Sequence, residues 1–155
     1  MPVFCSAPVQ KRYNSNRHLH AYPPDTTLLK LHRANPSGIN IFSGYGDGFV
    51  LVNGKRIDRS VVVLPERIID DWGATTFEAL TAAHLEALAG LEREVILLGT
   101  GNTLRFPRPE LMRAIAPRLA KANIGLEIMD VQAACRTYNI LIAEERRVAA
   151  ALLIE

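Results

Sequence analysis

The segment 99–102, Gly-Thr-Gly-Asn, has the residue types in this chain that best suit ligand chemistry. It follows the apolar run 95–98, which predicts a buried strand that ends at the first glycine. Glycines let a phosphate or a nucleotide approach the backbone closely, and Arg105 could supply positive charge. A dinucleotide fingerprint has a third glycine and leads straight into a helix, whereas Leu104 stands at that position and two prolines follow. The segment therefore predicts a small-ligand site only as an alternative function.

A carboxylate, Asp130, stands at the end of a second apolar run, 126–129. Glu144 and Glu145 lie about four turns along the helix that follows. That is roughly 20 Å at 1.5 Å per residue, too far for a cooperating acid–base pair. Asp130 is better explained as the N-cap of the following helix. The residues predicted for the ligand-binding alternative are Gly99, Thr100, Gly101, Asn102, Arg105 and Asp130.

Cysteine and histidine usage predicts neither a nucleophile nor a metal site. Cys5 and Cys135 show no CxxC or Cys/His spacing, and Cys135 lies inside a helical pattern, where it is expected to pack as a small hydrophobe. His18 and His20 could ligate a metal from alternate positions of a strand, but no third ligand is near them in sequence. We therefore expect no catalytic residue, no metal and no cofactor.

Three apolar runs must position these side chains, and they alternate with two helical patterns. The runs are 95–98, 126–129 and 148–154, an alternation typical of parallel βαβ units. Right-handed crossovers would place 99–102 and Asp130 on the same edge of the sheet. Ligands of open α/β sheets usually bind at that edge.

Helix boundaries are predicted from capping signals. Thr75 and Glu78 have capping-box spacing, which predicts a helix from Thr75 to about Gly90, with His84 on or beside its apolar face. A second helix is expected to begin at Pro109, contain Pro117 and end before residues 123–125. The last helix is expected over residues 131–146.

Residues 28–64 are predicted to form a β-meander. Asn53-Gly54 is a strong two-residue hairpin signal, and residues 43–48 are expected to form a glycine-rich loop. We expect these projections to present Tyr45 and Phe49 to a partner, because aromatic side chains make good interface anchors. The alternative, that both side chains pack onto their own sheet, stays open. The strands are expected at 28–31, 39–42, 49–52, 55–58 and 60–64.

Composition and charge define an ordinary globular domain. The 155 residues are 48% hydrophobic and 22% charged, with a formal net charge of +2. Residues 1–25 lack periodicity and are predicted to be a flexible leader, while 26–155 form a single α/β domain. The basic residues 11–17 surround one aromatic, Tyr13, which is too little to predict nucleic-acid binding. No apolar run approaches the roughly 18 residues that span a bilayer, and no signal-peptide layout is present, so the chain is expected to be cytoplasmic.

A scattered motif makes the chain similar to a known family. Its C-terminal part covers residues 99–101, 125–130, 137–139 and 149–152, with Ala134, Leu141 and Glu145, and its upstream part covers residues 49–54 and 60–65 with Trp72. Over about residues 25–155 the sequence resembles the family of NADH:ubiquinone oxidoreductase (respiratory complex I) assembly factor 3 and its uncharacterised prokaryotic relatives. One departure is Val131, where the family usually has threonine. The resemblance implies a single α/β domain with an extra β-hairpin region, and it implies no established catalytic residue or cofactor.

The sequence thus predicts an α/β fold: a three-layer single domain whose partly parallel central sheet is flanked by helices, with an N-terminal β-hairpin or meander region. The function we expect is non-catalytic, a protein-binding scaffold or assembly-factor-like module with protein partners and no nucleic-acid partner or integral membrane segment. A weak homo-oligomer is a further expectation. The alternative is a small-ligand-binding protein or enzyme that uses the cleft near Gly101 and Asp130.

Overall fold

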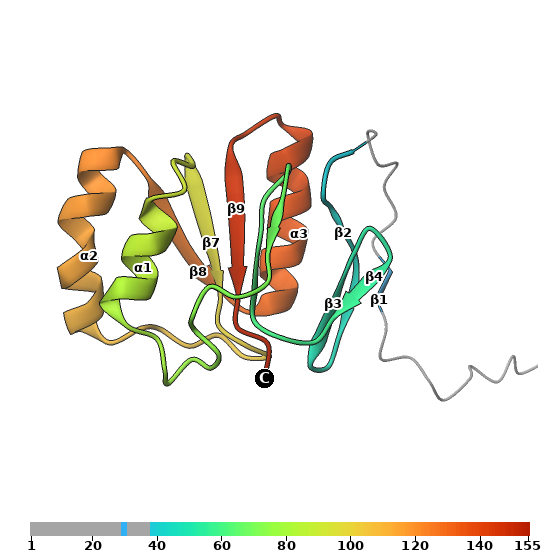
Figure 1. Cartoon of the computed structure of the whole chain (residues 1–155), viewed down its shortest axis with the longest axis horizontal. Coiled ribbons are helices and arrows are strands. Elements are labelled where there is room, and N and C mark those ends of the chain that lie inside the picture. The colour runs from blue at the N-terminus through green and yellow to red at the C-terminus, as the bar shows by residue number, and fades with distance from the viewer. Residues whose placement is uncertain (1–28, 31–37) are drawn as a thin grey trace, which may run out of the picture.

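The computed structural model describes the backbone of residues 29–30 and all of residues 38–155 (Figure 1). The predicted leader 1–25 lies outside the described residues, and so do Cys5, the His18/His20 pair and the basic residues 11–17. The elements are β1 (Leu29–Lys30), β2 (Phe42–Gly46), β3 (Phe49–Val52), β4 (Lys55–Ile57), β5 (Val61–Val63), β6 (Ile68–Ile69), α1 (Ala82–Ala89), β7 (Val95–Gly99), α2 (Pro109–Ala122), β8 (Gly125–Met129), α3 (Val131–Ala143) and β9 (Val148–Leu152).

The larger sheet has the strand order β6-β5-β9-β7-β8. β7 lies between β8 and β9 and is parallel to both, whereas β5 is antiparallel to β9 and to β6. β9 is buried along its whole length and reads Val-Ala-Ala-Ala-Leu, as expected for a central strand covered on both faces. The prediction of a partly parallel central sheet is confirmed.

The handedness of the two crossovers decides the layers. The connection from β7 to β8 runs one way across the sheet, and that from β8 to β9 runs back past β7. Because both crossovers are right-handed, their helices must lie on opposite faces. Figure 1 shows α1 and α2 on one face and α3 on the other. Each face has its own buried core, so the predicted three-layer α/β architecture is confirmed.

A second, four-stranded sheet, β1-β2-β3-β4, packs against α3 (Figure 1). The rings of Phe42 and Tyr138 meet edge-on with their centroids 5.1 Å apart. Beside them, the Asn139 side chain accepts a hydrogen bond from the Phe42 N–H (3.0 Å) and donates one to the Phe42 carbonyl (2.7 Å). These bonds join positions 97 residues apart, so one side chain of α3 binds both backbone polar groups of Phe42.

The predicted meander 28–64 is confirmed for the hairpin of β3 and β4 and is wrong at two of its strands. The strand expected at 39–42 is β2, which starts at Phe42, and the strand expected at 60–64 is β5, which belongs to the larger sheet because its three buried valines pair with β9 and β6. Asn53 and Gly54 both have positive φ, 50° and 81°, as a tight hairpin turn between β3 and β4 requires. The glycine-rich loop predicted over residues 43–48 is wrong, because β2 extends to Gly46 and only Asp47 and Gly48 form the turn. Pairing with β3 on one side and β1 on the other holds these glycines in extended conformation.

α1 begins later than its sequence signal indicated. The N-cap is Thr81, and the capping box joins Thr81 to His84 instead of Thr75 to Glu78. Segment 75–80 is irregular because tertiary contacts use its polar groups: the Thr75 carbonyl accepts from Ser60, and Glu78 pairs with Arg105. His84, expected on the apolar face, is a half-buried capping residue.

The other two helices agree better with prediction. α2 has Pro109 in its first turn and ends at Asn123, whose φ of 53° gives a left-handed C-cap. α3 begins at Val131 after the N-cap Asp130, but it ends at Ala143, three residues short of the predicted Arg146. The residues that start α2 and α3 were therefore predicted correctly from local signals, and only the predicted end of α3 was wrong.

Candidate functional site

The ends of β7 and β8 meet as the crossovers predicted. The Thr100 N–H donates to the Met129 carbonyl at 2.9 Å, and the Val131 N–H donates to the Gly101 carbonyl at 3.0 Å. Asp130 therefore lies beside segment 99–102, and this juxtaposition is confirmed. Its carboxylate accepts a 2.7 Å hydrogen bond from the Ala133 N–H, so it caps α3.

Thr100 is the buried centre of this edge. Its side chain is fully inaccessible, and its hydroxyl lies 3.1 Å from the Thr103 carbonyl and 3.2 Å from the Met129 carbonyl. The same oxygen accepts a 2.9 Å hydrogen bond from the Arg105 N–H. These bonds hold the first part of the loop that follows β7, residues 100–108, close to the end of β8.

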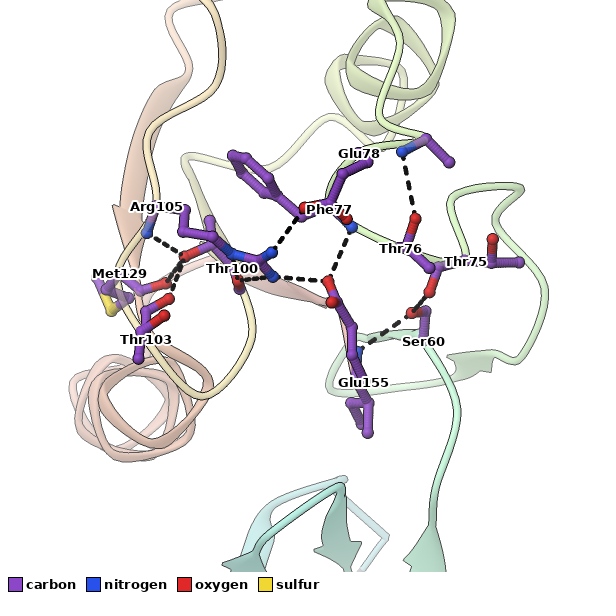
Figure 2. A network of polar contacts seen from close by, with 12 residues as sticks. Ser60, Thr75, Thr76, Phe77, Glu78, Thr100, Thr103, Arg105, Met129 and Glu155 are labelled. Atoms are coloured by element: carbon purple, nitrogen blue, oxygen red, sulfur yellow. Dashed lines mark hydrogen bonds and ion pairs between the residues drawn. The ribbon is translucent and has the colours of Figure 1, made fainter.

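Arg105 connects this loop to two distant segments (Figure 2). Its guanidinium donates to the Thr100 carbonyl at 2.6 and 2.9 Å. It also donates to Glu155 at 2.6 Å and to Glu78 at 3.0 Å. Its plane lies over the Phe77 ring, with the guanidinium carbon 4.5 Å from the ring centroid. We call Arg105 together with Thr100, Phe77, Glu78 and Glu155 the arginine cluster.

The space beside Gly101, where the sequence predicted that a ligand could approach the backbone, is filled by the Arg105 side chain. A Cβ atom on Gly101 would lie 2.7 Å from Arg105 Nη2, and Gly101 has a φ of +100°. The glycine thus accommodates a side chain of the same domain, and Arg105 is committed to internal partners. Asn102 donates to Asp47 in the β2–β3 turn and so connects the loop to the smaller sheet. Gly99, also in the predicted set, ends β7, where an added Cβ would lie 2.7 Å from Leu152 Cδ2, so no ligand space opens there.

Glu155 accepts two kinds of donor within the arginine cluster. Its carboxylate accepts from the Phe77 N–H at 2.9 Å and from Arg105. Partial burial acts to raise the pKa of Glu155, but these two hydrogen bonds and the positive charge of Arg105 outweigh it and hold the pKa below the usual glutamate value. The ionised form is therefore the one that the fold stabilises.

Replacing Glu155 with glutamine is expected to remove a pH-dependent part of the stability. Because the pKa is lower in the folded than in the unfolded chain, the wild type gains its advantage above the ordinary glutamate pKa of about 4.3 and loses it as the pH falls further. We expect a difference of up to about 1 kcal/mol between wild type and Glu155→Gln at pH 7, since the pair is partly exposed. Urea unfolding of both proteins between neutral and acidic pH measures it. A difference that does not shrink on acidification would contradict this role.

The loop that Arg105 holds exposes two large apolar side chains. Leu104 and Phe106 are 50% and 69% exposed, whereas Pro107 beyond them is buried. A hollow of about 470 Å³ lies next to Pro107, between the N-terminal ends of α1 and α2. It is lined by Phe77, Leu80, Ala82, Pro107, Leu111 and Ala114, with Glu78, Thr81, Arg108 and Glu110 also contributing. In the sequence, the exposed pair stands in an apolar-Arg-apolar triplet that lacks strand or helix periodicity, and the sequence-based prediction included only Arg105 of this triplet.

Tyr45 does not project as the expected interface anchor. Its side chain is 3% exposed, and its hydroxyl accepts a 2.7 Å hydrogen bond from Arg136 on α3. Tyr45 packs between its own sheet and α3, because α3 covers the face of β2 that carries it. Phe49 is half-buried, with the Arg56 guanidinium carbon 3.8 Å from its ring centroid.

The buried cysteine and the acidic groups of the described residues can be assessed in the same way. Cys135 is fully buried, and desolvation raises the pKa of its thiol, which favours the unreactive protonated form. Among residues 38–155, no group of three or more histidine, cysteine, aspartate or glutamate side chains is placed to hold a metal ion. The polar groups at the strand ends are instead hydrogen-bonded to one another.

The structure is therefore that of a small three-layer α/β protein, in which an arginine cluster at the strand ends shapes a loop that exposes Leu104 and Phe106. The chain belongs to the family described as protein of unknown function (DUF498/DUF598), whose sequence profile matches residues 42–153.

Curated relatives agree with the resemblance found in the sequence. A Bos taurus protein named NADH dehydrogenase (ubiquinone) 1 alpha subcomplex assembly factor 3 is 29% identical over 160 residues, which cover 98% of this chain and 84% of its own. The Drosophila melanogaster protein of the same name is 30% identical, covering 92% and 77%. A Francisella tularensis relative named 13 kDa major membrane protein is 32% identical over 118 residues, covering 72% and 89%.

Solved structures share the fold. A crystal structure of a Bordetella parapertussis protein aligns with a TM-score of 0.68 at 40% identity, covering 78% of this chain and all of its own. The solution structure of a Bordetella pertussis protein, described as a Mth938-like domain, aligns with a TM-score of 0.64 at 35% identity, covering 81% and 92%. In the described part of the chain, no helix combines the length and apolar character needed to cross a membrane.

Proposed function

We propose that this protein acts by binding a protein partner, without catalysing a reaction, and that the exposed pair Leu104 and Phe106 is the centre of the interface. The observation that carries the proposal is the rigid presentation of this pair. Two large apolar side chains are exposed to water on a loop in which Arg105, the residue between them, is hydrogen-bonded to Thr100 through both its N–H and its guanidinium. Aromatic residues that are rigid before binding lose little entropy at an interface and make strong anchors.

The names of the relatives support this function. The Bos taurus and Drosophila melanogaster relatives are named as assembly factors of a NADH dehydrogenase subcomplex, a name that implies contact with other polypeptides. We extend that role to this chain as a proposal: its partner is a polypeptide with a complementary apolar patch, a subunit or second factor of such a dehydrogenase. We place this activity in the cytoplasm.

The ligand-binding alternative carries a specific energetic cost. An anion beside Gly101 would have to displace the Arg105 guanidinium from the Thr100 carbonyl or share it with Glu78 and Glu155. Two carboxylates already neutralise this cation, so an added anion would meet net negative charge. Protein binding at Leu104 and Phe106 needs no such rearrangement.

Replacing Phe106 with serine is expected to abolish capture of the partner while leaving the fold intact. The side chain is mostly exposed, so its loss costs the free protein little, whereas an aromatic anchor typically contributes about 2 kcal/mol or more to binding, roughly a 30-fold change in affinity. Affinity capture from cell extract followed by mass spectrometry, with unfolding curves for each variant, measures both effects. Leu104→Ser should act in the same direction.

Ile140→Ser is the matched control, because Ile140 is also a large apolar residue that is more than half exposed, at 54%, but it lies on α3. It should retain the partners that Phe106→Ser loses. Equal loss with both variants would indicate nonspecific apolar adsorption and contradict the proposal. A reproducible turnover by the purified protein that disappears with Asp130→Asn would overturn the non-catalytic reading.

A further inference from the structure

β8 forms an open edge of the larger sheet. In the described part of the chain it pairs with β7 alone, and it is five residues long. The other edge strands of the two sheets are shorter, with two residues in β1, three in β4 and two in β6. Long edges are uncommon in proteins that act alone, because unpaired backbone groups form a template for another strand.

The register fixes which backbone groups face outward. The Gly125 N–H donates to the Glu94 carbonyl, and the Met129 carbonyl accepts from the Thr100 N–H, so these two positions face β7. Because backbone polar groups alternate sides along a strand, the N–H and carbonyl groups of Leu126 and Ile128 point away from the sheet. They offer two donors and two acceptors in a line to an added strand.

Next to this edge, one face of β8 lacks a helix. α3 packs against β7 and β9, and beyond it lies a hollow of about 520 Å³. Its apolar walls include Val95, Leu97, Met129 and Leu141, and Glu127 reaches its margin. Glu127 is exposed and forms no ion pair with any described residue, whereas the neighbouring Glu94 is paired with Arg146.

We propose that the β8 edge binds an extended segment of another protein, which adds a strand to the sheet and places a lysine or arginine opposite Glu127. Leu126 and Ile128 would supply the backbone hydrogen bonds, and an apolar side chain two residues from the cation would enter the hollow beside Met129. Strand addition of this kind obtains affinity from the backbone and specificity from alternate side chains. This surface is separate from Leu104 and Phe106, so the inference goes beyond the proposed function.

The charge at Glu127 argues against a second copy of this chain as the occupant. Two β8 edges joined antiparallel about a two-fold axis at Glu127 would pair Leu126 with Ile128 of the other copy. That register places the two Glu127 side chains directly opposite each other, in the closely spaced position where like charges are destabilising. A cationic segment meets the same carboxylate with the favourable sign.

The test uses a short peptide in which valine and lysine alternate, titrated into the full chain labelled with ¹⁵N. We expect the Leu126 and Ile128 amides to shift and to become protected from hydrogen exchange. A peptide with glutamate in place of lysine should bind about tenfold more weakly. The lysine peptide with alternate backbone nitrogens methylated keeps the charge but cannot pair as a strand, and it should not bind.

Glu127→Lys should reverse the preference between the two peptides, because this exposed side chain is not part of either core. Equal binding of the methylated peptide, shifts centred on residues 104–106, or no binding would each overturn the inference. The inference would also be overturned if sedimentation showed that Glu127→Gln binds a second copy of itself more tightly than it binds the lysine peptide. The second copy would then be the better occupant of this edge. Phe106→Ser should bind the lysine peptide as the wild type does, which separates this result from the fate of the proposed function.

Discussion

Replacing Gly101 with alanine is expected to lower the free energy of unfolding by about 3 kcal/mol. Two costs combine at this position. Gly101 has a φ of +100°, which alanine adopts only with strain, and its Cβ would lie 2.7 Å from Arg105 Nη2. The guanidinium would have to move away from the Thr100 carbonyl and Glu155. Urea unfolding measures the loss, and partner capture by the same variant should weaken because the loop that carries Phe106 is no longer held.

Gly54→Ala is the matched control for this prediction. Gly54 also has a positive φ, of 81°, but an added Cβ would meet no atom within 4 Å. It should therefore cost about 1 kcal/mol, the backbone strain alone. The difference between the two variants measures displacement of Arg105. Equal costs would mean that the arginine cluster adds nothing to the stability of the loop.

Replacing Tyr138 with alanine is expected to cost about 4 kcal/mol, the largest effect among these variants. The side chain is fully buried between the larger sheet and the smaller one, edge-on to Phe42. Its hydroxyl donates to the Asn40 carbonyl at 3.1 Å. Burial raises the pKa of this phenol, so the group remains a hydrogen-bond donor throughout the neutral range. Thermal and urea unfolding of the variant measure the loss.

Tyr138→Phe separates the contribution of the ring to stability from that of the hydroxyl. It keeps the packing against Phe42 and leaves one carbonyl without its donor, so about 1 kcal/mol should be lost. Tyr138→Ala with a stability within about 1 kcal/mol of the wild type would show that the smaller sheet docks on α3 without this ring. In that case Asn139, which bonds both backbone groups of Phe42, would be the residue that holds the two sheets together.

The two predictions concern different links between structure and function. Tyr138 lies where the smaller sheet joins the domain, whereas Gly101 lies where the strand ends shape the exposed loop. If both predictions hold, loss of partner capture with stability retained will be specific to Leu104 and Phe106. That separation allows the interface to be mapped without confusing it with the fold.

Local sequence determined the elements whose signals lie within a few residues. The apolar runs before Gly99 and Asp130 became β7 and β8, and Asn53-Gly54 formed its hairpin turn. Asp130 capped α3 as predicted, because an N-cap bond spans only three residues. The handedness of crossovers then followed from the chirality of the chain, so the meeting of segment 99–102 with Asp130 could also be predicted.

Tertiary structure alone decided the roles of Arg105, Tyr45 and Thr75. Glu155, which pairs with Arg105, is 50 residues away, and Arg136, which holds Tyr45 against α3, is 91 residues from it. Thr75 lost its cap role because Ser60 binds its carbonyl. In each case a residue had a plausible local use, and a partner distant in sequence offered a hydrogen bond instead. The partner of such a group is set by packing, which no short-range pattern in the sequence records.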